Sequence, residues 1–430
     1  MVANGGVMLS AHSAKVQRKK LTHSELASVI ALHERFRTGK PGGVRAMLAF
    51  ADLGGMAMAG ANLTEADCTG ASFRGAMMSD CVLDRATLFA CDFREADLEG
   101  ASLMRADLRG ACMRGANLTR ANLIQADLRE GSITQKDRAG NLHALKLGEV
   151  GATELQGAKL SAANLSEASM DGMLAGQADF TDAIMRDCKL ARANLQKAQL
   201  VGANLAGADL SGANCTGASL DGAVMTGTKL SNAVLDGATL VDVVNDNLAG
   251  KALSEQGVEP AELLRLHAAW AQTGGAEGKV ADLSGYDCRK LPPLAGQLLV
   301  GLRAEGAIFV GLDMRGCQLQ GARLAGADLR DCKLAGADLR GVNLAGAKLT
   351  RADLRDCDFT PLPLAAGRSF AAKLDKAVLR AADLRGAKFA GAGVSGIDIR
   401  DVTVDEEQFA GIDLADAVVD PRLKARLGIK

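Results

Sequence analysis

The chain has 430 residues, of which 50 are glycine, and 48% of its residues are apolar while only 3% are aromatic. Its 50 basic and 51 acidic side chains give a net charge of −1, which excludes a global field favouring nucleic acid or an anionic membrane. No stretch approaches the roughly 18 apolar residues of a transmembrane helix. An apolar interior with so few rings must be narrow, because aromatic side chains fill wide globular cores.

Residues 1–20 are expected to form a disordered basic tail. They contain Lys15, Arg18, Lys19 and Lys20 and lack the apolar core of a signal peptide, so a cytoplasmic protein is expected. Such a segment can tether a chain to a membrane or to nucleic acid. Four charges are weak evidence for a tether, however, and a solvated tail is the plainer interpretation.

Residues 21–45 are expected to form a capping helix followed by a glycine-rich turn. Thr22 and Glu25 have the spacing of a capping box, in which two side chains bond to free N–H groups at a helix start. The apolar residues that follow at helical spacing are Leu26, Val29, Ile30, His33 and Phe36.

From residue 46 the chain repeats a five-residue unit, Ala-(Asp/Asn)-Leu-x-x. We call the Leu, Phe or Met position the centre, and the Ala or Cys two residues earlier the small position. A period of five matches neither a helix nor a strand. One large and one small apolar residue therefore share the inner side of a short extended segment, and the next two residues turn the chain, where glycine is frequent.

The repeats form two predicted solenoids. The first covers residues 46–240 and shifts its phase by two residues after a bulge near 134–152, where Leu142 and Leu147 favour a continuing coil; its weakest unit is centred on Ala175. Residues 241–280 form a linker with a helix over 260–272, which begins at a proline and has one apolar face.

The second solenoid covers residues 281–419 and keeps one phase across the turn-rich segment 360–369; the tail 420–430 follows. The linker helix matches the N-terminal helix, and this match predicts two tandem modules, each with a helix over its first coil. Such a helix covers unpaired backbone and apolar interior at an open end. The matched cap residues are Leu32 with Leu266, His33 with His267, and Phe36 with Trp270.

The repeat resembles that of the pentapeptide-repeat family over roughly residues 46–419, and the chain is interpreted as a bacterial member of alphaproteobacterial type. The resemblance implies an all-β solenoid, a right-handed quadrilateral β-helix with four repeat units per coil, here with short capping α-helices. Coils then stack at about 4.8 Å. Rings that occupy the same place on successive coils should stack, as in the pairs Phe73 with Phe93 and Phe389 with Phe409.

The phase of the repeat assigns most side chains to the interior. Of the ten cysteines, only Cys112 is predicted to point outward, and none has the CxxC spacing of a zinc site, so we expect small apolar packing in a reducing compartment. The representative interior residues are Leu63, Phe73, Phe93, Leu108, Leu205, Leu324, Leu339, Cys81, Cys317 and Cys332.

No catalytic, cofactor or metal site is predicted, because the five histidines do not cluster and no GxSxG, P-loop, GxGxxG or HExxH element occurs. Most aspartates precede a centre, where they are expected to bond to turn backbone. One surface column is expected to alternate in charge on successive coils and to form an ion-pair ladder, each pair contributing about 0–1 kcal/mol. Its members are Asp313, Lys333, Asp353 and Lys373.

The sequence favours a non-enzymatic protein–protein interaction scaffold, built as a rigid β-helical rod with an unidentified protein partner. Direct nucleic-acid binding is not expected, and a homodimer is compatible with the pattern. The alternative comes from the family: some members imitate DNA and modulate type II topoisomerases such as DNA gyrase. Those members are strongly acidic, whereas residues 281–419 contain 19 acidic and 18 basic side chains.

Overall fold

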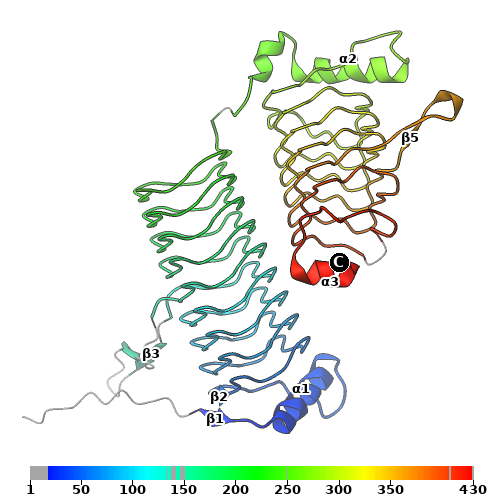
Figure 1. The fold of residues 1–430 in the computed structure, drawn as a ribbon. Helices are drawn as coiled ribbons and strands as arrows, with labels where there is room; N and C mark the ends of the chain where they lie inside the picture. The colour runs from blue at the N-terminus through cyan, green and yellow to red at the C-terminus, as the bar shows by residue number, and fades with distance from the viewer. Residues whose placement is uncertain are drawn as a thin grey trace, which may run out of the picture. The chain divides into compact units, whose positions relative to one another are not determined.

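The computed structural model describes residues 18–131, 133–136, 142–145, 151–247, 249–405 and 408–428. The chain divides into a first unit, residues 1–243, and a second unit, residues 244–430. Each unit is a stack of four-sided coils with a helix across its first coil (Figure 1). No helix in the described part of the chain has the length and apolar character to cross a membrane.

The coils of the first unit are held together by parallel β-bridges. The bridges join residues four repeat units apart, as in Asp52 with Ser72 and Asp97 with Asn117, so four five-residue units make one coil. Within a coil, the carbonyl of most centres accepts a hydrogen bond from the backbone N–H three positions later, as Leu48 does from Ala51 at 3.0 Å. Of the two residues in between, the second adopts a positive φ, as Phe50 does, which is the pattern of a type II turn.

Helix α1 (His23–Arg37) begins with the predicted capping box. The Glu25 backbone N–H donates to the Thr22 side chain, and the Thr22 N–H donates to the Glu25 carboxylate. Before the helix, strand β1 (Lys19–Lys20) pairs in parallel with strand β2 (Ala51–Asp52). The expected tail of residues 1–20 is therefore too long by at least these residues, and residues 1–17 lie outside the described part.

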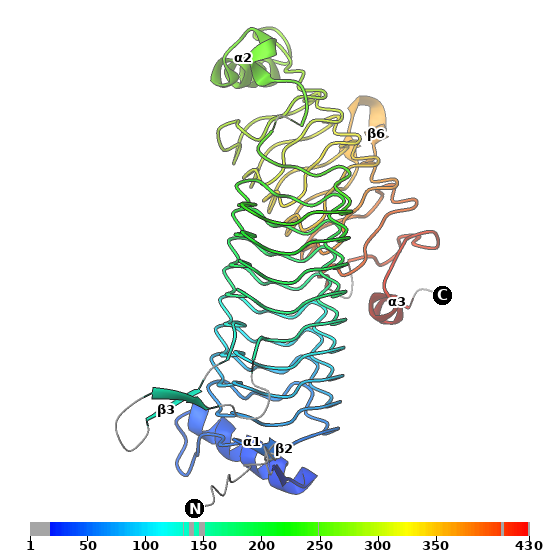
Figure 2. The ribbon, with the colours of Figure 1, turned by 90° about the vertical axis from the view of Figure 1, so that its left-hand side faces the viewer.

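The phase shift in the first unit results from an insertion in one coil. Cys112 bridges Glu154, so the chain between them exceeds one coil by four repeat units and a further two residues. The two extra residues account for the shift. Within the insertion, β3 (Ile133–Lys136) and β4 (Leu142–Leu145) form an antiparallel hairpin at the side of the unit (Figure 2). The expected coil through Leu142 is therefore wrong, and Leu147 lies outside the described residues.

The weak repeat unit at Ala175 keeps its volume by exchanging two positions. Ala175 occupies the centre and Met173 occupies the small position, and both side chains are fully buried. Large and small residues have therefore changed places along one inner wall. A close-packed interior tolerates this exchange because the summed volume is unchanged.

The second unit begins with η1 (Leu253–Gln256) and helix α2 (Pro260–Gln272), and it ends with helix α3 (Pro421–Leu427). The expected tail of residues 420–430 is therefore mostly helical. Asp420 caps α3, and Leu423 of α3 is buried in the core of the unit, so this helix closes the last coils (Figure 1).

A second insertion, equal in length to two repeat units, interrupts the second unit. β5 (Leu362–Pro363), η2 (Ala365–Gly367) and β6 (Ser369–Phe370) form a hairpin within it. Across the hairpin the bridged residues are six repeat units apart instead of four, as in Asp358 with Lys388. The phase survives because the insertion is a whole number of units, although the hairpin is not part of the coil wall.

Candidate functional surfaces

The predicted interior residues all point into the coils. Phe73 and Phe93 stack with ring centroids 4.9 Å apart, and Phe389 stacks on Phe409 at 5.2 Å. The interior therefore offers no open space for a ligand at these levels. Side-chain exposure is 0–1% for Leu63, Phe73, Phe93, Leu108, Leu205, Leu324, Leu339, Cys81, Cys317 and Cys332.

The cysteines at small positions make a hydrogen bond that the repeat pattern did not reveal. The Cys81 thiol donates to the carbonyl of Met58, on the preceding coil, at 2.8 Å, and the same bond recurs at Cys91, Cys188, Cys317, Cys332 and Cys357. Burial raises the pKa of the Cys81 thiol to about 11 and that of Cys317 to about 12. These thiols therefore stay protonated and unreactive at neutral pH.

Both capping helices use a histidine to close the first coil. The fully buried His33 accepts a hydrogen bond at Nδ1 from the Ala46 N–H at 3.1 Å, and its Nε2–H donates to the Thr64 carbonyl at 3.0 Å. In the second unit, His267 Nδ1 accepts from the Ala281 N–H at 3.0 Å.

The two caps agree in further details. His33 stacks on Phe36 and His267 on Trp270, with ring centroids 6.0 and 5.8 Å apart. The backbone carbonyls of Leu32 and Leu266 each accept an N–H from the chain returning to the solenoid, at 3.0 Å in both cases. Sequence comparison aligned these residues, but the bonds to the coil became visible only in the structure.

The predicted charged column is wrong at its fourth member. Backbone β-bridges join Asp313 to Lys333 and Lys333 to Asp353. The next coil then places Asp383, and not Lys373, beside Asp353, because the β5–β6 hairpin lengthens this coil. Lys373 instead bridges Asn343 on another side of the coil. The two neighbouring carboxylates are held by Arg355, whose Nη2 lies 2.7 Å from Asp353 Oδ2 and whose Nε lies 3.7 Å from Asp383 Oδ2.

Asp-x-Arg clamps replace the expected Asp–Lys ladder as the main charge pattern. In the example at residues 313–315, Asp313 Oδ1 accepts from the Arg315 backbone N–H at 3.3 Å, and the guanidinium binds both carboxylate oxygens at 2.9 and 2.6 Å. The Arg315 side chain lowers the pKa of Asp313 to about 2. The recurring Asp-Leu-Arg triplet was a readable signal for these clamps.

The clamp occurs ten times among the described residues. The pairs are Asp92–Arg94, Asp107–Arg109, Asp127–Arg129, Asp287–Arg289, Asp313–Arg315, Asp328–Arg330, Asp338–Arg340, Asp353–Arg355, Asp383–Arg385 and Asp398–Arg400. Each pair places one negative and one positive side chain close together, so the faces carry many charged side chains but little local net charge.

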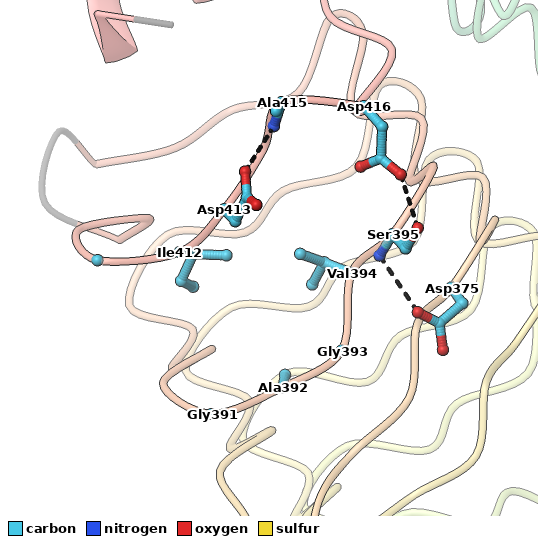
Figure 3. Close-up of a pocket in the computed structure, with 11 residues that line it drawn as sticks. Asp375, Gly391, Ala392, Gly393, Val394, Ser395, Ile412, Asp413, Ala415 and Asp416 are labelled. Atoms are coloured by element: carbon cyan, nitrogen blue, oxygen red, sulfur yellow. Dashed lines mark hydrogen bonds between the residues drawn. The ribbon is translucent and has the colours of Figure 1, made fainter.

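An open hollow lies on the second unit near its last coils (Figure 3). It has a volume of about 510 Å³ and three carboxylates at its edge. Asp375 accepts from the Ser395 N–H at 3.2 Å, Asp416 accepts from the Ser395 hydroxyl at 2.6 Å, and Asp413 accepts from the Ala415 N–H at 3.0 Å. The hydrogen bond from Ser395 lowers the pKa of Asp416, whereas a carboxylic general acid needs a raised pKa.

The geometry offers no metal centre in the part of the chain that the structure describes, since no three His, Cys, Asp or Glu side chains come together there. The ten cysteines are free thiols, and Cys112 is the one that is not fully buried. Its thiol lies 3.2 Å from Glu154 Oε2. What remains accessible is therefore the set of outward faces, the two hairpins and the capping helices.

Comparison with known proteins agrees with the coil geometry. A family model described as pentapeptide repeats matches in eight copies that together cover more than half of the chain. No curated protein sequence matches. Together with the parallel bridges between coils, the family match confirms the predicted right-handed quadrilateral β-helix. The matched ranges are 44–80, 81–120, 113–135, 153–190, 176–212, 208–244, 322–360 and 371–401.

The solved structures that are similar to this chain include those of HetL, QnrB1 and Rfr23. HetL, involved in heterocyst differentiation regulation in the cyanobacterium Nostoc sp. strain PCC 7120, is 25% identical over 78% of this chain and 96% of its own, with a TM-score of 0.16. QnrB1, a plasmid-mediated fluoroquinolone resistance protein, is 19% identical over 45% and 90%, with a TM-score of 0.24. Rfr23 from the cyanobacterium Cyanothece 51142 is 26% identical over 31% and 91%, with a TM-score of 0.23.

Proposed function

Because this chain belongs to the pentapeptide-repeat family, we propose that it is a non-enzymatic scaffold that binds another protein on its outward faces. The observation that carries the proposal is the separation of apolar side chains in the interior from charged side chains on the outer faces. Large and small apolar residues fill the interior, while the charged residues are fixed on flat faces by the Asp-x-Arg clamps. A rigid face loses little conformational entropy when a partner binds.

The proposed location is the cytoplasm. Ten free cysteines, nine of them buried, are suited to a reducing compartment. A bacterial source is likewise kept as a prediction from the sequence. The location is tested by fractionating cells that express the tagged chain.

The scaffold proposal is tested by crosslinking and affinity capture of the full-length tagged chain from its native cytoplasm. We expect a partner that is recovered in near-stoichiometric amount and that also captures this chain when the partner carries the tag. Purified components should then co-elute in size-exclusion chromatography. Recovery of no such partner under crosslinking conditions would sink the proposal.

The alternative, a DNA-mimicking modulator of DNA gyrase, is less well supported by the charges. A DNA imitation needs rows of uncompensated negative charge, whereas Asp313 and Asp353 each bind a guanidinium two residues later. We therefore expect the purified chain to leave gyrase supercoiling unchanged at micromolar concentration. Inhibition or protection of gyrase in that assay would instead favour the alternative.

A further inference from the structure

One column of the second unit carries positive charge without clamps. Arg303 bridges Arg323, Arg323 bridges Asn343, and Asn343 bridges Lys373, so the four residues lie on consecutive coils. Arg303, Arg323 and Lys373 are exposed, and their side chains form no hydrogen bond or close ion pair with another described residue, although Asp282 lies opposite Arg303 on the preceding coil and attracts it. We call these three residues, with Asn343 between them, the cationic column.

The column differs from the other arginine positions of this unit in a specific way. Clamped arginines such as Arg315 and Arg355 follow a centre and bind the aspartate two residues earlier. Arg303 and Arg323 occupy the position just before the centre, where that aspartate would stand. Like charges directly opposite on neighbouring strands destabilise a sheet, so stability does not explain the arginine at position 323, which has Arg303 on one side and the uncharged Asn343 on the other.

Apolar side chains flank the corner beside the cationic column. The corner residues Gly301 and Gly321 each stand two positions before one of its arginines. A methyl group on Gly301 would lie 3.3 Å from the Trp270 ring, and one on Gly321 would lie 3.8 Å from Leu362. One coil further, a methyl group on Gly341 would meet Leu362 at 2.9 Å and the Phe370 ring at 3.2 Å.

Helix α2 and the β5–β6 hairpin therefore place apolar side chains beside three successive corners: Trp270 near Gly301, Leu362 near Gly321 and Gly341, and Phe370 near Gly341. We call Trp270, Leu362 and Phe370 the apolar wall. Phe370 is 44% exposed, although it is the largest side chain of the hairpin. An exposed aromatic ring beside unclamped cations is typical of an interaction site. The hairpin, which the repeat does not need, thus completes one edge of this surface.

We propose that the cationic column and the apolar wall bind an extended acidic peptide segment of a partner protein, in which Asp or Glu alternates with apolar residues. Alternate side chains of an extended chain point to opposite sides, so its carboxylates can face the column while its apolar residues face the wall. Arginine binds carboxylates through two parallel hydrogen bonds. Four coils span about 14 Å, which matches about four extended residues.

The charges around the column favour a peptide over a nucleic acid. Asp282 stands next to Arg303 at the end of the column, Glu305 and Asp375 follow Arg303 and Lys373 by two residues, and each of the three carboxylates accepts a hydrogen bond from a serine. A polyphosphate would meet these carboxylates along its length, and its affinity depends on many uninterrupted cationic contacts. A short acidic segment needs only the three cations of the column. This inference rests on the proposed scaffold function and names one of its binding faces.

The test measures fluorescence anisotropy of labelled Gly-Glu-Leu-Glu-Phe-Glu-Leu-Gly with the full-length protein in about 50 mM salt, where surface charges are weakly screened. The Arg303→Gln/Arg323→Gln variant should bind about tenfold more weakly. The matched control, Arg315→Gln/Arg355→Gln, removes the same charge from clamps on another side and should stay within about twofold of the wild type. Phe370→Ser should weaken binding about threefold through loss of the apolar contact.

Several outcomes would overturn the inference. These are absence of binding at about 1 mM protein, equal binding of a peptide with Gln in place of Glu, an equal loss in the control variant, or tighter binding of oligothymidylate. Thermal unfolding of the column variant should stay close to that of the wild type, because the substitutions remove both the Arg303–Arg323 repulsion and the Asp282–Arg303 attraction. If native capture retains its partner with the column variant, the scaffold function stands and the column assignment fails; if the wild type captures no partner, the scaffold function itself fails.

Discussion

Replacing His33 by leucine tests whether the capping histidine holds the first coil closed. Leucine keeps most of the apolar volume but leaves the Ala46 N–H and the Thr64 carbonyl without their partners. Each buried polar group without a hydrogen bond costs about 1–3 kcal/mol, so the free energy of opening the first coil should fall by about 2–5 kcal/mol. The neutral Nε2–H tautomer follows from these two partners.

The second cap supplies a matched comparison. His267 Nδ1 accepts from the Ala281 N–H, but the contact of its Nε2 with the Leu299 backbone is too poorly aligned to match the bond that His33 makes to Thr64. The His267→Leu variant therefore loses one bond and should cost about 1–3 kcal/mol, roughly half of the loss at His33.

The assay is amide hydrogen exchange with mass spectrometry on peptides covering residues 44–66 and 281–303. Each coil contacts only its neighbours, so each variant should lose protection in the first coils of its own unit and keep it elsewhere. Equal losses in the two variants, or a loss spread evenly over a whole unit, would refute the role given to the histidine bonds.

Three further predictions concern the pH dependence of stability, the reactivity of the cysteine thiols and the packing of the β5–β6 hairpin. Burial lowers the pKa of His33 and of His267 below 6.5, so the unfolded chain takes up protons before the folded chain does as the pH falls. The free energy of unfolding, measured with urea, should therefore be highest above pH 6.5 and decrease below it. The variant with leucine at both positions should lose this pH dependence. In native protein, maleimide should label Cys112 and leave the nine buried cysteines unlabelled until denaturant is added; rapid labelling of several thiols would contradict the packing. Gly341→Ala and the control Gly336→Ala both place a methyl group at positive φ, at about 1 kcal/mol each, but only the first meets Leu362, so only its β5–β6 hairpin should become sensitive to protease.

The interior residues were predictable because the five-residue pattern of large and small apolar positions recurs in most units of the chain. Leu63 and Cys81 belong to units whose neighbours repeat the same large and small positions, so one misread unit changes nothing. Packing then follows from the pattern alone, since a residue two positions from the next inward residue shares its side of the chain. The capping box at Thr22 was readable for a similar reason, because all of its atoms lie within one helical turn.

The bonds of the caps were not readable, although the matching of His33 with His267 was. A histidine beside an apolar stripe indicates burial, but the sequence does not state which backbone groups of a distant coil end without partners. Ala46 and Ala281 each lie beyond the end of the helix that carries their histidine, across a glycine-rich turn. In both units the backbone N–H of the first small residue, Ala46 or Ala281, has no coil before it to accept its hydrogen bond, and the histidine of the capping helix supplies the acceptor. This need arises only from the folded coil and cannot be read from the sequence.

The error at Lys373 separates two quantities that the repeat pattern combines. Phase tells which side chains point inward, and it survives any insertion of whole repeat units. Register tells which coil neighbour a residue meets, and it survives only insertions of whole coils. The β5–β6 insertion adds half a coil, so Phe359 and Phe389 keep their inward phase but become stacking neighbours only through the insertion, and Lys373 moves from the Asp353 column to the Asn343 column. Surface columns, on which recognition depends, are therefore set by where insertions leave the coil, and the same hairpin that moved Lys373 placed it in line with Arg303 and Arg323.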